Sequence, residues 1–184
     1  MRTKTTQLLI GSMLIISGCI SSGPDNNAGF GHIEKIEDIE GIYKNSGEGR
    51  TSSHTIYLSR IIWPKEKGLE HKDIETIHVR KIDNHTLVVK AVVNTVVKKE
   101  STFVEGKDFE IGNGRIRLNL GGGIAGLKAG EPLVGPYYES AELGLDSRGH
   151  GKYRKSFATA GLVYLFLPIA IGGNEDVRFI RLND

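Results

Sequence analysis

The chain has 184 residues, with 24 Lys and Arg against 22 Asp and Glu, and it contains one cysteine. A formal charge of +2 gives no bulk electrostatic case for nucleic-acid binding, and a single cysteine excludes an intramolecular disulfide. This length suffices for one buried core and indicates one folded domain.

The N-terminus is built like a secretory signal. Arg2 and Lys4 form a short positive segment, residues 8–16 are apolar, and the small residues Ser17 and Gly18 follow. The apolar run is too short to cross a membrane as a helix. We therefore predict that residues 1–18 are a signal peptide, and its removal takes away the two residues that make up the excess of positive charge.

The residues around the cysteine resemble a bacterial lipobox, in which an aliphatic residue and two small residues precede an invariant cysteine. Here they are Ile16, Ser17, Gly18 and Cys19. The resemblance implies that the Cys19 thiol receives a diacylglyceryl group and that cleavage falls between Gly18 and Cys19. The alternative is a secreted protein with a chance cysteine, which is disfavoured because free thiols are normally avoided in an oxidising compartment.

The residue after the cysteine bears on location. It is Ile20 and not the aspartate that, in the lipoprotein family, favours the inner membrane. The resemblance therefore implies a lipid anchor in the cell envelope, on the periplasmic side of the outer membrane if the host has two membranes.

Residues 19–40 are predicted to be the lipidated cysteine and a flexible tether. Residues 20–31 are rich in Gly, Ser, Pro, Asp and Asn, with little to bury. After them Ile33, Ile36 and Ile39 recur at every third position, which predicts one or two helical turns or a charged lead-in.

Residues 41–184 are predicted to form a β-rich globular domain. The stretch Gly41-Ile42-Tyr43 resembles the Gly-x-Trp at the start of lipocalin barrels. Strands are expected at residues 76–82 and 86–93, joined by Asp83-Asn84-His85. Pairing Ile82 with Thr86 gives one apolar face, made of Ile77, Val79, Leu87, Val89 and Ala91.

Other segments alternate in the same way, at residues 115–120, 137–146, 150–157 and 177–182. We predict an all-β fold, an antiparallel meander of about eight strands that forms an up-and-down barrel or a strongly curved sheet. A β-sandwich is the alternative.

Patterns for catalysis and cofactors are weak. Residues 121–126 match G-x-G-x-x-G, but Gly130 and Pro132 would break the helix that a dinucleotide site needs. The six histidines are scattered, and no G-x-S-x-G motif is present, so we predict no cofactor, no metal site and no enzyme. A hydrolase is a third, less favoured hypothesis.

Two segments are functional candidates. Residues 121–136 are rich in glycine and form either a linker between strands or a mobile binding loop. Residues 158–173 are the most apolar stretch after the signal peptide, and they form either a buried strand kinked at Pro168 or an apolar loop that lines a ligand cavity or touches the membrane. The candidate contact residues are Leu162, Tyr164, Phe166 and Pro168.

Two function classes follow from these features. The first is a lipid-anchored envelope protein that binds an apolar ligand or contacts the membrane. The second is a structural lipoprotein that docks an envelope protein partner and has no ligand cavity. Composition does not separate them, and a β fold by itself does not either.

Overall fold

The structure is a computed structural model that describes residues 16–49, 55–118, 122–125, 133–163 and 167–182. Its strands and helices are β1 Ile16–Ser22, the 3-10 helix η1 Ile36–Ile39, β2 Gly41–Lys44, the α-helix α1 Leu58–Ile62, β3 Thr76–Asp83, β4 Thr86–Val93, β5 Val96–Val104, β6 Glu110–Gly112, β7 Arg115–Leu118, β8 Gly122–Ala125, β9 Leu133–Leu145, β10 Gly151–Val163, β11 Leu167–Phe179 and β12 Arg181–Leu182. Within these residues a seven-stranded sheet runs β1-β11-β10-β9-β7-β6, with β8 also paired to β9, and a five-stranded sheet runs β12-β2-β3-β4-β5.

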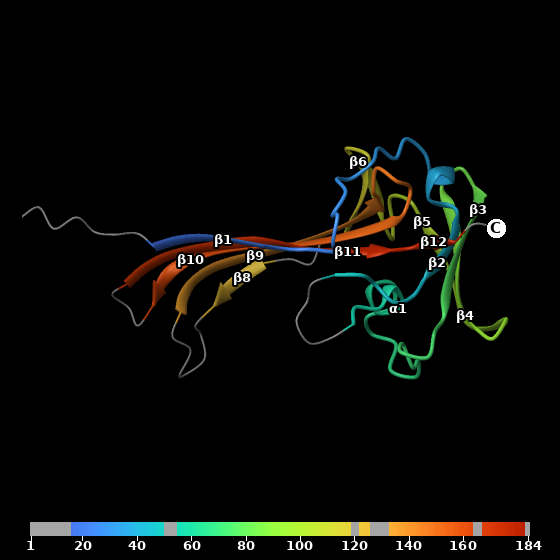
Figure 1. The fold of residues 1–184 in the computed structure, drawn as a ribbon, viewed down its shortest axis with the longest axis horizontal. Helices are drawn as coiled ribbons and strands as arrows, with labels where there is room; N and C mark the ends of the chain where they lie inside the picture. The colour runs from blue at the N-terminus through green and yellow to red at the C-terminus, as the bar shows by residue number, and fades with distance from the viewer. Residues whose placement is uncertain (1–15, 50–54, 119–121, 126–132, 164–166, 183–184) are drawn as a thin grey trace, which may run out of the picture.

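The three longest strands give the molecule its shape. Strands β9, β10 and β11 have 13 residues each, and β10 pairs with β11 from Gly151 opposite Phe179 to Val163 opposite Leu167. One half of these strands lies in a globular part, and the other half projects from it, flanked by β1 and β8 (Figure 1). We call the projecting part the arm (residues 16–22, 122–125, 133–138, 156–163 and 167–174) and the remainder the head.

The second sheet is a meander whose register was predicted. Strand β3 pairs with β4 from Thr76 opposite Val92 to Lys81 opposite Leu87, the predicted register. The predicted apolar face points inward, since its members are buried or nearly so. The predicted pairing of Ile82 with Thr86 is wrong. The register shifts there and Asp83 faces Thr86, because the Asp83 carboxylate accepts the His85 N–H at 2.8 Å and closes a tighter turn.

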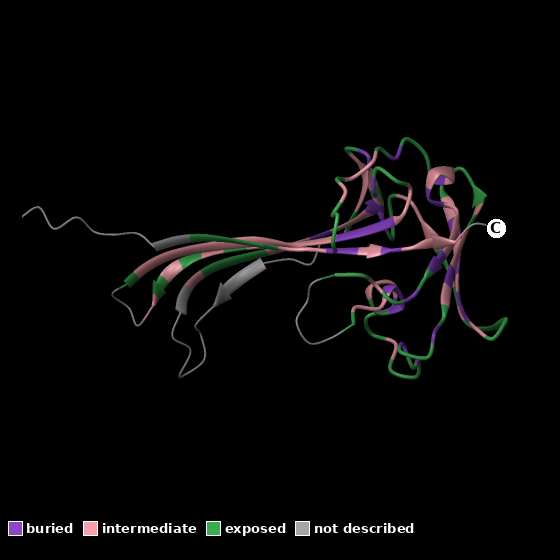
Figure 2. Cartoon of the chain, in the orientation of Figure 1, coloured by how far each residue is buried: buried purple, intermediate pink, exposed green. Residues whose placement is uncertain are grey.

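The core lies in the head, between the two sheets. One cluster is centred on Phe179, Ile77 and Val177, and a second is centred on Ile33, Leu87 and other residues near η1. The buried residues are concentrated in the head, whereas residues 18–22, 135–138, 156–163 and 167–174 of the arm are intermediate or exposed (Figure 2). The arm therefore has no core of its own.

The all-β prediction and the antiparallel meander are confirmed. In the described residues both sheets stay open, one ending in β12 and β5 and the other in β1 and β6. A closed barrel is therefore not formed there, and the arrangement agrees with a strongly curved sheet or a sandwich. The strands also exceed the predicted eight, because several are only two to four residues long.

Part of residues 19–40, the segment predicted to be a tether, packs on the body in the structure. Residues 19–22 belong to β1, which pairs in parallel with β11. The side chains of Ile33, Ile36 and Ile39 are buried. Their spacing of three matches the three residues per turn of a 3-10 helix, which puts them on one face.

Both functional candidate segments differ from their simplest interpretations. Residues 158–163 and 167–173 form two legs of a hairpin in the arm, so the prediction of a buried strand is wrong. Within residues 121–136, Gly122–Ala125 is strand β8, and β9 begins at Leu133, so these parts are neither linker nor loop. Residues 121 and 126–132 lie outside the described residues.

Candidate functional site

The arm has one face on which bulky apolar side chains predominate and one on which most side chains are small. Neighbouring side chains of a strand point to opposite faces, and the register aligns the odd-numbered residues of β9, β10 and β11 on one face. This bulky face carries Ile20, Tyr137, Phe157, Val163, Leu167, Ile169 and Ile171. The other face, which we call the small face, carries Tyr138, Ser156, Ala158, Ala160, Leu162, Pro168, Ala170 and Gly172.

The bulky face is the core face of the head, continued without a covering layer. Tyr153 and Val177 lie opposite each other on the same odd-numbered face and are buried between the sheets of the head. Farther along the arm this cover is missing: on the bulky face Ile20 is 60% exposed, Tyr137 42% and Leu167 36%, and on the small face Tyr138 is 57% and Leu162 38% exposed. The second sheet remains at the head end (Figure 1). An uncovered apolar surface of this kind is typical of a site that contacts a membrane or another molecule.

Charged residues mark the boundary between head and arm. On the bulky face the Lys155 ammonium lies 3.1 Å from a Glu139 carboxylate oxygen, and Lys155 is paired across the strands with Glu175. Toward the tip, the described residues of the arm include no Asp, Glu, Lys or Arg. The uncharged legs have eight described residues each, 156–163 and 167–174, or about 26 Å at roughly 3.3 Å per residue.

Cys19 lies on the edge of this arm. It is exposed, and in β1 it is paired with Gly172 of β11. The neighbouring pair, Ile20 with Gly173, is unusually close, because a Cβ at Gly173 would collide with the carbonyl oxygen of Ile20. The predicted lipidation site and the bulky apolar face therefore share one structural element.

A buried ionic cluster fixes the chain that follows β1 to the sheet. The Asp176 carboxylate accepts hydrogen bonds from Arg154 at 2.6 and 2.7 Å and from Asn27 at 2.7 Å, and it lies 2.8 Å from the Lys152 ammonium. The Phe30 ring packs beneath Arg154 and Lys152. Burial alone would raise the pKa of the Asp176 carboxyl, but the hydrogen bonds from Arg154, Lys152 and Asn27 hold this pKa well below its usual value. We call these five residues the clamp.

The predicted site residues are distributed along the arm. Gly18 and Cys19 are in β1, and Leu162 pairs with Pro168 across the hairpin on the small face. Tyr164 and Phe166 lie outside the described residues. Ile169 and Ile171, which lie on the bulky face, were not among the residues predicted from the sequence. The alternation of large and small residues over positions 167–172 was the signal for them.

A Ser–His contact bears on the hydrolase hypothesis. The Ser59 hydroxyl lies 3.0 Å from Nδ1 of His71, and burial lowers the pKa of His71. Ser59 is 0% exposed, and its N–H is held by the fully buried Asn45 side chain, which also binds the carbonyls of His71 and Ile74. The contact therefore joins a loop to α1, and a substrate has no access to this hydroxyl.

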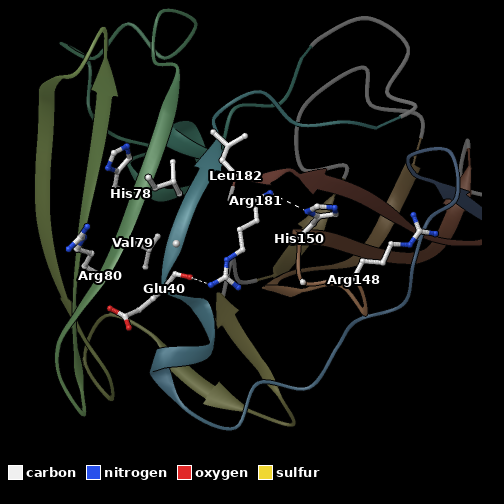
Figure 3. Close-up of a pocket in the computed structure, with 11 residues that line it drawn as sticks. Glu40, His78, Val79, Arg80, Arg148, His150, Arg181 and Leu182 are labelled. Atoms are coloured by element: carbon white, nitrogen blue, oxygen red, sulfur yellow. Dashed lines mark hydrogen bonds between the residues drawn. The ribbon is translucent and has the colours of Figure 1, made fainter. Parts of the chain in front are cut away.

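A groove of about 610 Å³ opens beside β2, β3 and the turn before β10. It brings together three arginines, but they do not converge: Arg80 and Arg148 lie on opposite sides of Arg181 (Figure 3). The Arg181 guanidinium donates to the backbone carbonyl of Glu40. The backbone N–H of Arg181 donates to Nδ1 of His150 at 3.2 Å. Arg181 thus connects β12 to the segments that contain Glu40 and His150, and its side chain is not directed at a ligand.

Metal ligands, membrane-spanning helices and known relatives give no further indication of a site in the described residues. The part of the chain described here holds no cluster of three or more His, Cys, Asp or Glu suited to a metal ion. None of its helices is both long and apolar enough to span a membrane. The chain matches no protein-family model, no curated protein and no solved structure.

Proposed function

We propose that this protein is a lipid-anchored envelope protein that lays the bulky face of its arm into a membrane surface. The observation that supports this most is the uncovered, uncharged apolar face on the same arm as Cys19. Fully burying an exposed aliphatic side chain contributes about 1.5–3 kcal/mol. Ile169 and Ile171 are already partly buried, so each contributes less than this and several residues of the face must act together.

The open edges of the arm favour contact in the plane of the membrane. Strand β1 forms one edge of the described sheet, and β8 pairs only with β9 there. Unpaired backbone N–H and C=O groups cost several kcal/mol each in hydrocarbon. A sheet that lies flat buries its bulky face among acyl chains, while its edges and small face stay near the headgroups and water.

Lipidation of Cys19 supports the same placement. A diacylglyceryl group supplies two acyl chains, and stable anchoring takes at least two, because one chain binds only marginally. Cys19 pairs with Gly172, so its side chain leaves the edge strand on the small face, and its acyl chains pass round this edge of the sheet to reach the bilayer that the bulky face enters. With Ile20 after the cysteine, the lipobox resemblance favours the outer membrane of a host with two membranes.

A second candidate is docking of an envelope protein partner on the arm. The open edges favour it, since an exposed strand can pair with a strand of another chain. Such a partner would cover the same apolar face and would not need a lipid surface.

A vesicle flotation experiment tests the proposed function. Residues 19–184 carrying Cys19→Ser lack the lipid, so any binding to phosphatidylcholine vesicles comes from the body of the protein. We expect this protein to float with the vesicles. Ile171→Glu should lower its partition coefficient at least 10-fold, because a carboxylate placed in hydrocarbon costs about 2.5–3.5 kcal/mol.

The matched control is Ala170→Glu, which puts the same charge one residue away on the small face. We expect this variant to float like its parent, and circular dichroism checks that both variants fold. If the two glutamates have the same effect, or if the parent stays in the aqueous fraction, membrane contact through the bulky face is wrong and the docking candidate gains.

A further inference from the structure

The head contains an apolar cavity that is separate from the arm. It has a volume of about 420 Å³ and lies between the two sheets. Val79, Val89 and Phe103 line it from one sheet, and Leu143 and Phe179 line it from the other, with Ile61 of α1 beside them. This volume is within the roughly 300–1,000 Å³ of small-molecule binding sites.

The two core clusters explain why the space is there. They join through three partly buried side chains that pack against both, Val79, Phe103 and Leu145, and the cavity lies along this junction. Every element around the space is fixed by strand pairing or by burial in one of the clusters. The side chains that line the cavity are therefore held in place by the fold of the head.

The lining offers water few partners. Tyr43 lines the wall, and its hydroxyl donates to the carbonyl of Ile39 at 2.9 Å, so this polar group already has a partner. The Lys152 ammonium at the border is held by Asp176 and the carbonyl of Ala28. A buried water needs two to four polar partners, so this cavity suits an apolar occupant better than water.

The cavity has an opening to the surface. Asp108 and Arg117 line one end and are exposed, and both also line a neighbouring surface groove of about 660 Å³. Because Asp108 and Arg117 carry opposite charges, this opening favours neither an anionic nor a cationic headgroup. The selectivity of the site therefore lies in the apolar interior.

We infer that the head binds one acyl chain in this cavity, between the two sheets. This acyl chain belongs either to a free fatty acid or to a membrane lipid, since both present the same hydrocarbon to the wall of the cavity. The inference rests on the lining and the opening of the head, and it does not need the arm to contact a membrane.

Photolabelling in membranes tests this inference on the protein that is expressed from the full sequence. Membranes that contain it are incubated with palmitate bearing a diazirine, irradiated, and the labelled peptides are mapped by mass spectrometry. We expect label in the head within residues 76–93, which supply Val79, Leu87 and Val89 of the wall. We also expect excess unlabelled palmitate to remove this label, because the site is saturable.

Two variants on one strand provide the matched pair. Val89→Phe fills the cavity and should reduce labelling of the head at least 10-fold. Val88→Phe makes the same change on the other face of β4 and should leave labelling unchanged. If Val89→Phe fails to fold, the competition with unlabelled palmitate still decides the question in the native protein.

The outcomes separate the cavity from the arm. Label confined to the arm would overturn the inference and leave the proposed membrane contact standing. Label in the head that excess palmitate does not remove, or that Val89→Phe does not reduce, would also overturn it. Label in the head without any in the arm would support the cavity and count against membrane contact.

Discussion

At the scale of single residues, Asp176 is the group whose chemistry matters most for the fold. It is 3% exposed and accepts hydrogen bonds from three side chains, two of which are cationic. Through Asn27 it holds the segment that follows the edge strand β1. The clamp thus connects this segment directly to the central sheet.

Asp176→Asn should destabilise the protein by about 3–5 kcal/mol at pH 7, because it leaves the buried Lys152 without its counter-charge. The folded-state pKa of Asp176 is depressed, so its contribution is present above about pH 4 and is lost as the pH falls. The difference in the free energy of unfolding between wild type and Asp176→Asn should therefore decrease by about 1.4 kcal/mol per pH unit below pH 4.

Urea unfolding at pH 7 and at pH 2.5 measures this difference. The control is Glu142→Gln, which removes the partner of Arg115 in a more exposed pair and should cost about 1 kcal/mol or less. A gap for Asp176→Asn that stays constant from pH 7 to pH 2.5 would show that the clamp does not stabilise the fold through its charge.

At the scale of elements, the parallel pairing of β1 with β11 depends on a glycine. Gly173 lets the Ile20 carbonyl approach, and Gly172 has only ordinary contacts at the same place in the strand. We expect Gly173→Ala to detach β1 and speed amide exchange at residues 20–22, while the head stays protected. Gly172→Ala should leave this exchange slow.

Hydrogen exchange of residues 19–184 carrying Cys19→Ser measures both variants. Equal exchange at residues 20–22 in Gly172→Ala and Gly173→Ala would mean that β1 does not need this close approach. The same measurement shows whether the arm keeps its edge strand after removal of residues 1–18.

Several elements could be predicted from local pattern. The alternation in residues 76–93 favoured the β3–β4 register, since a register shifted by one residue would put Ile77 and Val89 on opposite faces. The turn could not be predicted in detail, because the hydrogen bond from His85 to the Asp83 side chain shifts it by one residue. Asn27 and Phe30 looked like linker residues, and only the fold brings them to Asp176 and Arg154.

At the scale of the whole molecule, the central point is that the two sheets cover each other only in the head. The apolar stretch at residues 158–173 has the composition of a buried strand, and composition predicts burial. Whether a second layer covers such a strand depends on where a distant sheet ends, which no local pattern records. The same distant packing makes the cavity at the junction of the two clusters.

The proposed contact of the bulky face with a membrane can be measured directly at single labelled residues. Because Cys19 is the only cysteine, Cys19→Ser allows single labelling sites at Ile169→Cys and Ala170→Cys, on opposite faces of the arm. With an environment-sensitive fluorophore and phosphatidylcholine vesicles, we expect a blue shift and quenching by spin-labelled acyl chains at position 169. Position 170 should keep the emission of an aqueous site. Equal aqueous spectra at both positions, or quenching at position 170 alone, would contradict the proposed contact.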